Sequence, residues 1–130
     1  MFDEVLKAFK EAEAYNGPSI IIAYSPCIAH GIKGGLVNSQ VQAKLATECG
    51  YWPTFRYNPV LEKEFKNPFQ LDSKEPDWSK YRAFLMSEAR YAQLAQINPS
   101  KAEDLLEANL KDAQRRYKMY KRDQAMDFSE

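Results

Sequence analysis

The residues of this chain that are best suited to chemistry lie in one loop, around Cys27 and His30. A thiol can act as a nucleophile, a redox group or a metal ligand, and an imidazole can act as its base. A cysteine–histidine nucleophile pair is therefore one hypothesis, although base and nucleophile usually come from different elements of a fold. Because His30 is the only histidine, one chain cannot build a metal site from several histidines. A redox or metal role for Cys27 remains a hypothesis, but a single thiol cannot form such a site without other groups.

The elements around this loop predict where Cys27 lies. Ile20, Ile21 and Ile22 form an unbroken β-branched run, which predicts a strand over residues 19–24 that is buried on both faces. Pro26 cannot donate to a ladder and ends the strand, so we place Cys27 on the loop beyond its carboxyl end, where ligands collect in open α/β sheets. An amphipathic helix from residue 2 precedes the strand, as in half of a parallel βαβ unit. Since a buried strand needs neighbours, we expect another polypeptide segment to supply them.

The rest of the chain predicts mainly helices. We expect a helix over residues 36–48 that stops at Gly50, a short strand over residues 54–58, and an irregular surface stretch over residues 60–76. A long helix should run from a cap at Asp77 to about residue 97, and a capping box, Ser100 to Glu103, should open the last helix. The apolar stripe of the helix over residues 36–48 is expected at Leu36, Val37, Val41, Lys44, Leu45 and Glu48. The last helix should pack on the preceding one through Ala102, Leu106, Leu110, Ala113, Tyr117 and Tyr120.

Composition excludes several classes of partner. Lys plus Arg and Asp plus Glu both number 18, so no strong positive field is available for nucleic acid. No apolar run approaches the roughly 20 residues that span a bilayer, so no membrane partner is expected. Since Asp3 and Glu4 open the chain in place of a signal peptide, we expect a cytoplasmic protein with reduced cysteines. Cys49 is expected as a small buried hydrophobe.

Two groups of charged residues have competing explanations. The carboxylates of the polar stretch fit solvated charges or helix caps better than general acid–base work; they are Glu62, Glu64, Asp72, Glu75 and Asp77. The cations of the last helix either complement its dipole or form a docking surface for an acidic partner; they are Lys111, Arg115, Arg116, Lys118, Lys121 and Arg122.

Three blocks of sequence, in this order and spacing, carry a resemblance to a known family: IIIAYSPCIAHGI, GYWPTFRYNP and NPFQLDSKEP. The chain resembles the C-terminal end of the pyruvate:ferredoxin (flavodoxin) oxidoreductases over almost its whole length. The resemblance implies an α/β fold class, namely the C-terminal part of a thiamine-binding parallel-sheet domain, mostly helical here with about two short strands. Residues 1–130 would form a single unit. Residues 1–58 would end the thiamine-binding domain, and residues 59–130 would form a surface loop and C-terminal helices.

The resemblance also implies a function for the parent enzyme. Such enzymes oxidatively decarboxylate pyruvate with coenzyme A to acetyl-coenzyme A and carbon dioxide, and they pass electrons through 4Fe–4S clusters to ferredoxin or flavodoxin. Thiamine diphosphate with magnesium carries the carbanion chemistry. In the family, the cluster nearest thiamine takes three cysteines from upstream and the fourth from a loop like AYSPCIAHG. By that motif Cys27 is the metal- and cofactor-binding residue, and no catalytic residue is assigned. The implied partners are the remainder of the polypeptide, the electron acceptor and, in the parent, a second copy in a homodimer.

The motifs that are missing predict a fragment. The GDG-type motif that holds thiamine diphosphate, the CxxC pair and the third cluster cysteine do not occur in this sequence. No capping residue precedes the first helix, which also suggests a truncated end. We therefore expect the isolated chain to be inactive and to bind no cofactor. Two other hypotheses remain: a free-standing helical interaction module that docks a partner through the C-terminal aromatic seam, and a small thiol enzyme that uses Cys27.

Overall fold

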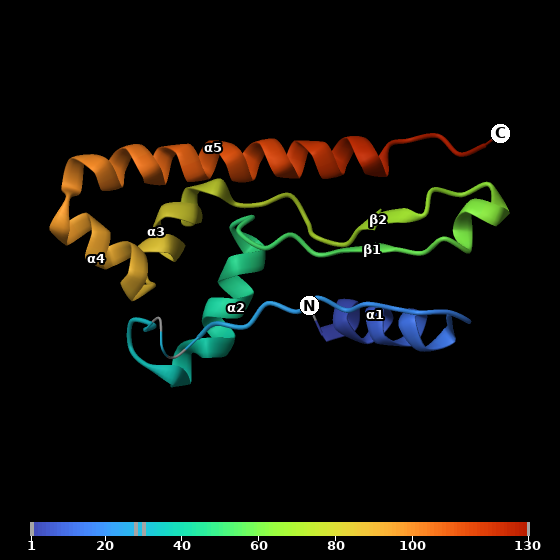
Figure 1. The fold of residues 1–130 in the computed structure, drawn as a ribbon, viewed down its shortest axis with the longest axis horizontal. Helices are drawn as coiled ribbons and strands as arrows, with labels where there is room; N and C mark the ends of the chain where they lie inside the picture. The colour runs from blue at the N-terminus through green and yellow to red at the C-terminus, as the bar shows by residue number, and fades with distance from the viewer. Residues whose placement is uncertain (1, 28, 30, 130) are drawn as a thin grey trace.

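The computed structural model describes residues 2–27, 29 and 31–129, and the described chain is elongated and mainly helical (Figure 1). Its helices are α1 (Phe2–Ala14), α2 (Ser39–Glu48), α3 (Tyr81–Met86), α4 (Ala89–Ile97) and α5 (Pro99–Gln124). Short 3-10 turns cover Leu36–Asn38, Leu61–Glu64 and Trp78–Lys80. The strands are β1 (Phe55–Tyr57) and β2 (Phe69–Leu71). The predicted composition, mostly helical with about two short strands, is confirmed.

The strands form a two-stranded antiparallel sheet in which Arg56 pairs with Gln70. β1 lies in the segment predicted to be a strand, whereas β2 lies in the stretch that we expected to be irregular. The predicted strand over residues 19–24 is wrong: this segment pairs with no strand among the described residues. Ile20 is 86% exposed and Ile22 75% exposed, because no neighbouring strand or helix of the described chain covers them.

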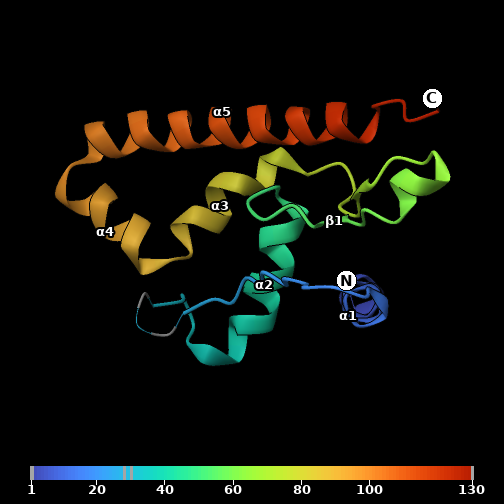
Figure 2. The same cartoon turned by 45° about the vertical axis from the view of Figure 1, so that its right-hand side comes forward.

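The core lies where α3 passes between α2 and α5. Tyr81, Phe84 and Leu85 of α3 are at most 1% exposed, and Cys49 at the end of α2 is fully buried, as predicted. α5 lies along α4, α3 and β2, which both views of the ribbon show (Figure 1, Figure 2). The buried residues of α5 are Ala102, Ala113 and Tyr117, all members of the predicted seam, and Leu106 and Leu110 are partly buried against the core, so the seam is confirmed for these five. Tyr120 instead packs on Phe55 and Phe69 of the two strands, not on the preceding helix.

One helix start and one helix interior depart from the predictions, whereas another helix start agrees with them. Asp77 is a cap as expected, since its side chain accepts from the Ser79 amide at 3.2 Å. The long helix over residues 77–97, however, breaks after Met86, and Glu88 has extended backbone with φ −99° and ψ 128°. The predicted capping box is also wrong. Asn98 caps α5 by accepting from the Lys101 amide at 3.1 Å, and Pro99, which lacks an N–H, takes the first helical position.

The helix predicted over residues 36–48 is present as a 3-10 turn followed by α2, but its buried face differs from the predicted one. Gln42 and Ala46 are buried, whereas Val37 is 85% exposed and Val41 65% exposed. The predicted stop is confirmed: Gly50 has φ +82°, and a Cβ there would lie 2.7 Å from the Trp78 ring. This close approach lets the end of α2 pack directly against the start of α3.

Candidate functional site

Cys27 carries a free, exposed thiol on a segment without regular secondary structure. The proposed nucleophile pair cannot be assessed, since His30 lies outside the described residues. Within the described ranges, no group of three or more His, Cys, Asp or Glu side chains is placed to hold a metal ion. The loop therefore presents one sulfur to its surroundings.

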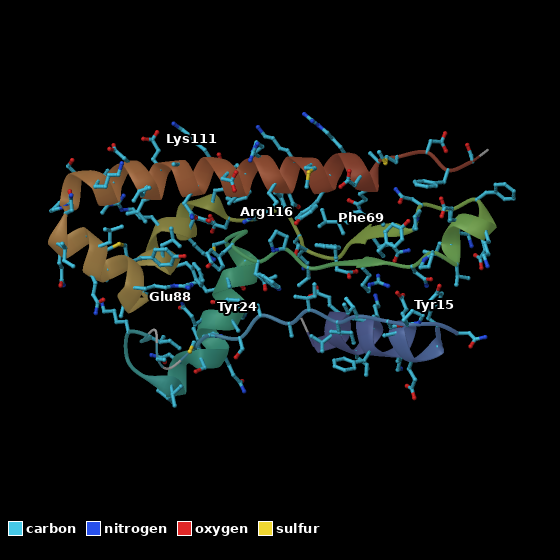
Figure 3. All side chains as sticks on the ribbon, viewed as in Figure 1. Tyr15, Tyr24, Phe69, Glu88, Lys111 and Arg116 are labelled. Carbon is cyan, nitrogen blue, oxygen red and sulfur yellow. The ribbon has the colours of Figure 1, made fainter. Side chains whose placement is uncertain are left out.

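The residue before the loop is fixed to the body of the molecule. The Tyr24 hydroxyl donates to Glu88 Oε1 at 3.0 Å. Its ring also packs against Trp52 and Tyr51, with centroids 5.5 Å and 5.9 Å away. Figure 3 shows Tyr24 and Glu88 next to each other, on the side of α2 that faces α4. The segment leading to Cys27 is thus held by one hydrogen bond and two ring contacts.

The residues after the loop are fixed to the same place by their backbone. Ile32 forms an antiparallel bridge with Glu88. The Lys33 amide donates to the Ser87 carbonyl at 2.9 Å, and the Ala89 amide donates to the Gly31 carbonyl at 3.1 Å. This pairing needs extended backbone at Glu88, which a continuous helix would not provide. The residues after the loop therefore pair with the backbone at the unexpected break between α3 and α4.

The Glu88 carboxylate is the centre of a polar network. Its side chain is 5% exposed, and Oε2 accepts from Arg90 Nε at 2.7 Å. Arg90 Nη2 also donates to the Tyr51 hydroxyl at 3.1 Å, and the Tyr51 and Tyr91 hydroxyls lie 3.2 Å apart. Such charge-assisted bonds offset the cost of burying a carboxylate.

Burial and hydrogen bonds favour the neutral phenols of Tyr24 and Tyr91. Burial and, to a smaller extent, the bond to Glu88 raise the pKa of Tyr24 well above its ordinary value. Burial, with the bond to Tyr51, raises the pKa of Tyr91 to about 12. The Tyr24 hydroxyl therefore stays a hydrogen-bond donor toward Glu88 throughout the neutral range.

A hollow of about 180 Å³ opens beside this network, and Cys27 lies on its wall. Its lining combines the loop with the carboxylate–guanidinium pair: Tyr24, Ser25, Pro26, Cys27, Gly31, Ile32, Glu88 and Arg90. The site can thus present a thiol to a neighbouring group from a loop that is anchored on both sides.

Sequence reasoning missed the residues that anchor the loop. Glu88 lay inside a predicted helix, three residues after Leu85 and seven after Tyr81, a helical spacing that places all three on one face. A carboxylate on a buried face needs a partner, and this was the available signal. Nothing in the sequence connected Arg90, Tyr51 or Tyr91 with the Cys27 loop.

Several of the other charged candidates pair with residues of this chain. Asp72 is not a solvated charge: it holds Arg56 through Nε at 2.7 Å and Nη2 at 2.8 Å, and both side chains are 13% exposed. On α5, Lys111, which Figure 3 labels, pairs with Glu107, and Arg115 pairs with Asp112. No described helix is long and apolar enough to cross a membrane.

Comparisons with known proteins give a consistent relationship. No protein-family model matches the chain. It is 52% identical over 119 residues to the pyruvate:ferredoxin oxidoreductase of Moorella thermoacetica and 48% identical over 120 residues to the pyruvate-flavodoxin oxidoreductase of Klebsiella pneumoniae. Each match covers 92% of this chain and 10% of the relative, so the chain spans about one tenth of their length. The mitochondrial pyruvate dehydrogenase [NADP(+)] of Euglena gracilis is 43% identical over 84% of the chain.

Proposed function

We propose, on the premise that the chain is similar over 92% of its length to one tenth of pyruvate:ferredoxin and pyruvate-flavodoxin oxidoreductases, that it is a segment of such an enzyme. The whole enzyme would convert pyruvate and coenzyme A to acetyl-coenzyme A and carbon dioxide and pass two electrons to ferredoxin or flavodoxin. The segment alone would be inactive. We expect the enzyme to be a cytoplasmic homodimer, to which this chain contributes a structural wall.

Within that enzyme we propose Cys27 as one of the four thiolate ligands of a 4Fe–4S cluster. The donor chemistry fits, because Cys27 is a free, exposed cysteine on an anchored loop, and thiolates are the usual ligands of such clusters. When bound, the cluster supplies one-electron transfer, while thiamine diphosphate with magnesium supplies carbanion stabilisation elsewhere in the enzyme. Since the described residues place a single thiolate here, the other three ligands must come from other segments. The contribution of this chain is to hold Sγ of Cys27 at a fixed position.

The observation that carries this proposal is the combination of high identity with the geometry of the loop. Identity of 48% and 52% extends through nearly the whole chain, and the one exposed cysteine described lies on a segment fixed at both ends. Cys49 is fully buried, and burial raises the pKa of its thiol, so it fits a packing role.

A chimera tests the proposal. The matching tenth of the Moorella thermoacetica enzyme is replaced by this chain, and the purified protein is assayed for coenzyme A-dependent oxidation of pyruvate and for iron. We expect an active chimera with a full iron content. Cys27→Ala should lose one cluster, or convert it to a three-iron form visible by electron paramagnetic resonance, and should abolish electron transfer.

The matched control is Cys49→Ala, which removes a buried thiol and should leave the iron content unchanged. Unaltered iron and normal electron transfer in the Cys27→Ala chimera would refute the ligand assignment. An inactive chimera with the native loop sequence would argue against the whole proposal.

The alternative of a free-standing docking module relied on the aromatic end of α5. Those rings pack inside the chain, Tyr117 against Trp78 at 6.0 Å and Tyr120 against Phe55 at 5.0 Å between centroids. Tyr117 is 3% exposed. These ring contacts support a role of the seam in packing within this chain.

A further inference from the structure

Among the described residues, the segment that carries Cys27 lies outside every helix and strand. Residues 25–27 belong to no helix or strand, and the Ser25 hydroxyl reaches only the carbonyl of the next residue, Pro26, at 3.3 Å. Segments outside regular secondary structure are usually positioned by the contacts at their ends. The position of the thiol therefore depends on what fixes the two ends.

Both ends meet at one residue. On the incoming side, the Tyr24 hydroxyl donates to Glu88 Oε1 at 3.0 Å. On the outgoing side, the backbone of Glu88 bridges Ile32, and the flanking amide of Lys33 donates to Ser87. Glu88 therefore acts through its side chain on one end of the loop and through its backbone on the other.

Glu88 is itself held rigidly. Its second oxygen accepts from Arg90, and Arg90 continues to the hydroxyl of Tyr51. The Tyr51 ring packs on Phe84 in the core, with centroids 4.6 Å apart. Both carboxylate oxygens are therefore engaged, and the side chain is 5% exposed. A buried carboxylate with satisfied charge-assisted bonds has little freedom to move.

We propose that Glu88 is a positioning residue for Cys27, closing the ends of the loop onto the break between α3 and α4 and tying it through Arg90 and Tyr51 to the core. This inference rests on the proposed function only for its purpose, which is to fix a ligand sulfur. The clamp itself is a property of this chain and can be tested without any cluster.

The test measures amide hydrogen exchange over residues 24–33 of this chain and the alkylation rate of Cys27 by iodoacetamide. Tyr24→Phe removes one hydroxyl and no ring contact. Losing a bond to a carboxylate should raise exchange in this segment about tenfold and speed alkylation. The matched control is Tyr81→Phe, which removes a core hydroxyl that bonds Asn109, far from the loop in sequence. It should leave exchange in residues 24–33 unchanged.

Substitutions of Glu88 extend the test. Glu88→Ala should free the loop more than Tyr24→Phe, and Glu88→Gln should rescue part of the protection, because its amide carbonyl still accepts from Tyr24. Exchange over residues 24–33 that matches the Tyr81→Phe control in both Tyr24→Phe and Glu88→Gln overturns the proposal. Rapid exchange of this segment in the unaltered chain overturns it as well.

The same variants in the chimera separate this inference from the ligand assignment. Tyr24→Phe should keep the full iron content but shift the reduction potential or the electron paramagnetic resonance spectrum of the cluster. A substitution that only destabilises the fold away from the loop should change neither. If Cys27→Ala leaves iron unchanged, the ligand role fails while the exchange result stands. If exchange does not respond but Cys27→Ala loses iron, the clamp fails and the ligand role stands.

Discussion

Two phenylalanines of this chain both lie on helices but differ in how far their side chains are exposed. Phe84 of α3 is fully buried between α2 and α5, whereas Phe9 of α1 is 57% exposed. The α3–α5 region closes its core within the chain. The region formed by α1 and residues 15–24 does not, since Val5 is 51% exposed and Ile20 86% exposed. A helix can thus form from its pattern while its apolar face remains uncovered.

The boundary between the two regions is an open groove of about 1120 Å³, lined by α1 and residues 18–24 on one side and by parts of α2, β1 and α5 on the other. Figure 1 shows α1 lying below the β1–β2 pair. One link across the groove is the ion pair between Glu11 and Arg56. Apolar surface of this extent usually marks an interaction site. Among the described residues, one region therefore buries its apolar side chains within the chain, whereas the other leaves them exposed.

The same substitution in the two regions gives the largest expected contrast. Phe84→Ala removes a fully buried ring and should lower the free energy of unfolding of the chain by about 3–5 kcal/mol. Phe9→Ala removes a largely exposed ring, so it should change this free energy by less than about 0.5 kcal/mol. Urea unfolding at low protein concentration measures both free energies.

Circular dichroism of each folded variant provides the control, since both should keep the helical content of the parent. A loss for Phe9→Ala as large as that for Phe84→Ala would mean that α1 is packed into the core in solution. The contrast between the regions would then disappear.

High pH should weaken the closed region before the open one. Burial raises the pKa of Tyr91 to about 12 and also raises the pKa of Tyr81. Because a raised pKa favours the neutral phenol in the folded state, this stability is complete below the unfolded value of about 10. It is lost as the pH rises through about 12. After allowance for solvent screening, Tyr91 should contribute on the order of 1 kcal/mol.

Urea unfolding at pH 8 and pH 11.5 measures this loss, with Tyr91→Phe as the test variant. The variant should lose less stability than the parent between these two pH values. Tyr15→Phe in the open region is the matched control and should lose as much as the parent. An identical pH dependence for Tyr91→Phe and the parent would contradict the assignment.

The limits of sequence-based prediction follow the same division. Periodicity located the last helix and its seam, because Ala113 and Tyr117 bury against residues of this same chain. It misjudged Ile20 to Ile22, because a β-branched run predicts burial whether or not the covering segment belongs to the chain. It also missed the break at Glu88. That break depends on pairing with Ile32, 56 residues earlier, and local pattern carries no information on such a contact.

The candidate site shows a similar limit. A resemblance singled out Cys27, and the structure places it on an exposed loop, but the anchors of that loop come from long-range contacts. Tyr24 and Glu88 are 64 positions apart, and Arg90 and Tyr51 are 39 apart. The helical spacing of Glu88 after Tyr81 and Leu85 carried a signal that this carboxylate needs a partner, but no information on which residue that partner is.

The smallest expected effect concerns the link between the two regions. Arg56 bonds Asp72 and Gln70 within its own region and Glu11 across the groove. The bonds to Asp72 dominate, and they raise the pKa of Arg56. Glu11→Gln removes the charge on the α1 side only. Because the Glu11 side chain is 38% exposed, the free energy of unfolding should fall by less than about 1 kcal/mol.

The informative readout for Glu11→Gln is local. Amide exchange in α1 should rise several-fold while exchange in α3 and α5 stays constant, because α1 can open without disturbing the closed core. Glu13→Gln, on the same helix, is the matched control and should change neither. A rise in exchange that spreads from α1 into α3 would show that the two regions unfold together. α1 would then belong to the same cooperative unit as the core, stabilised through Arg56, and would not open independently of it.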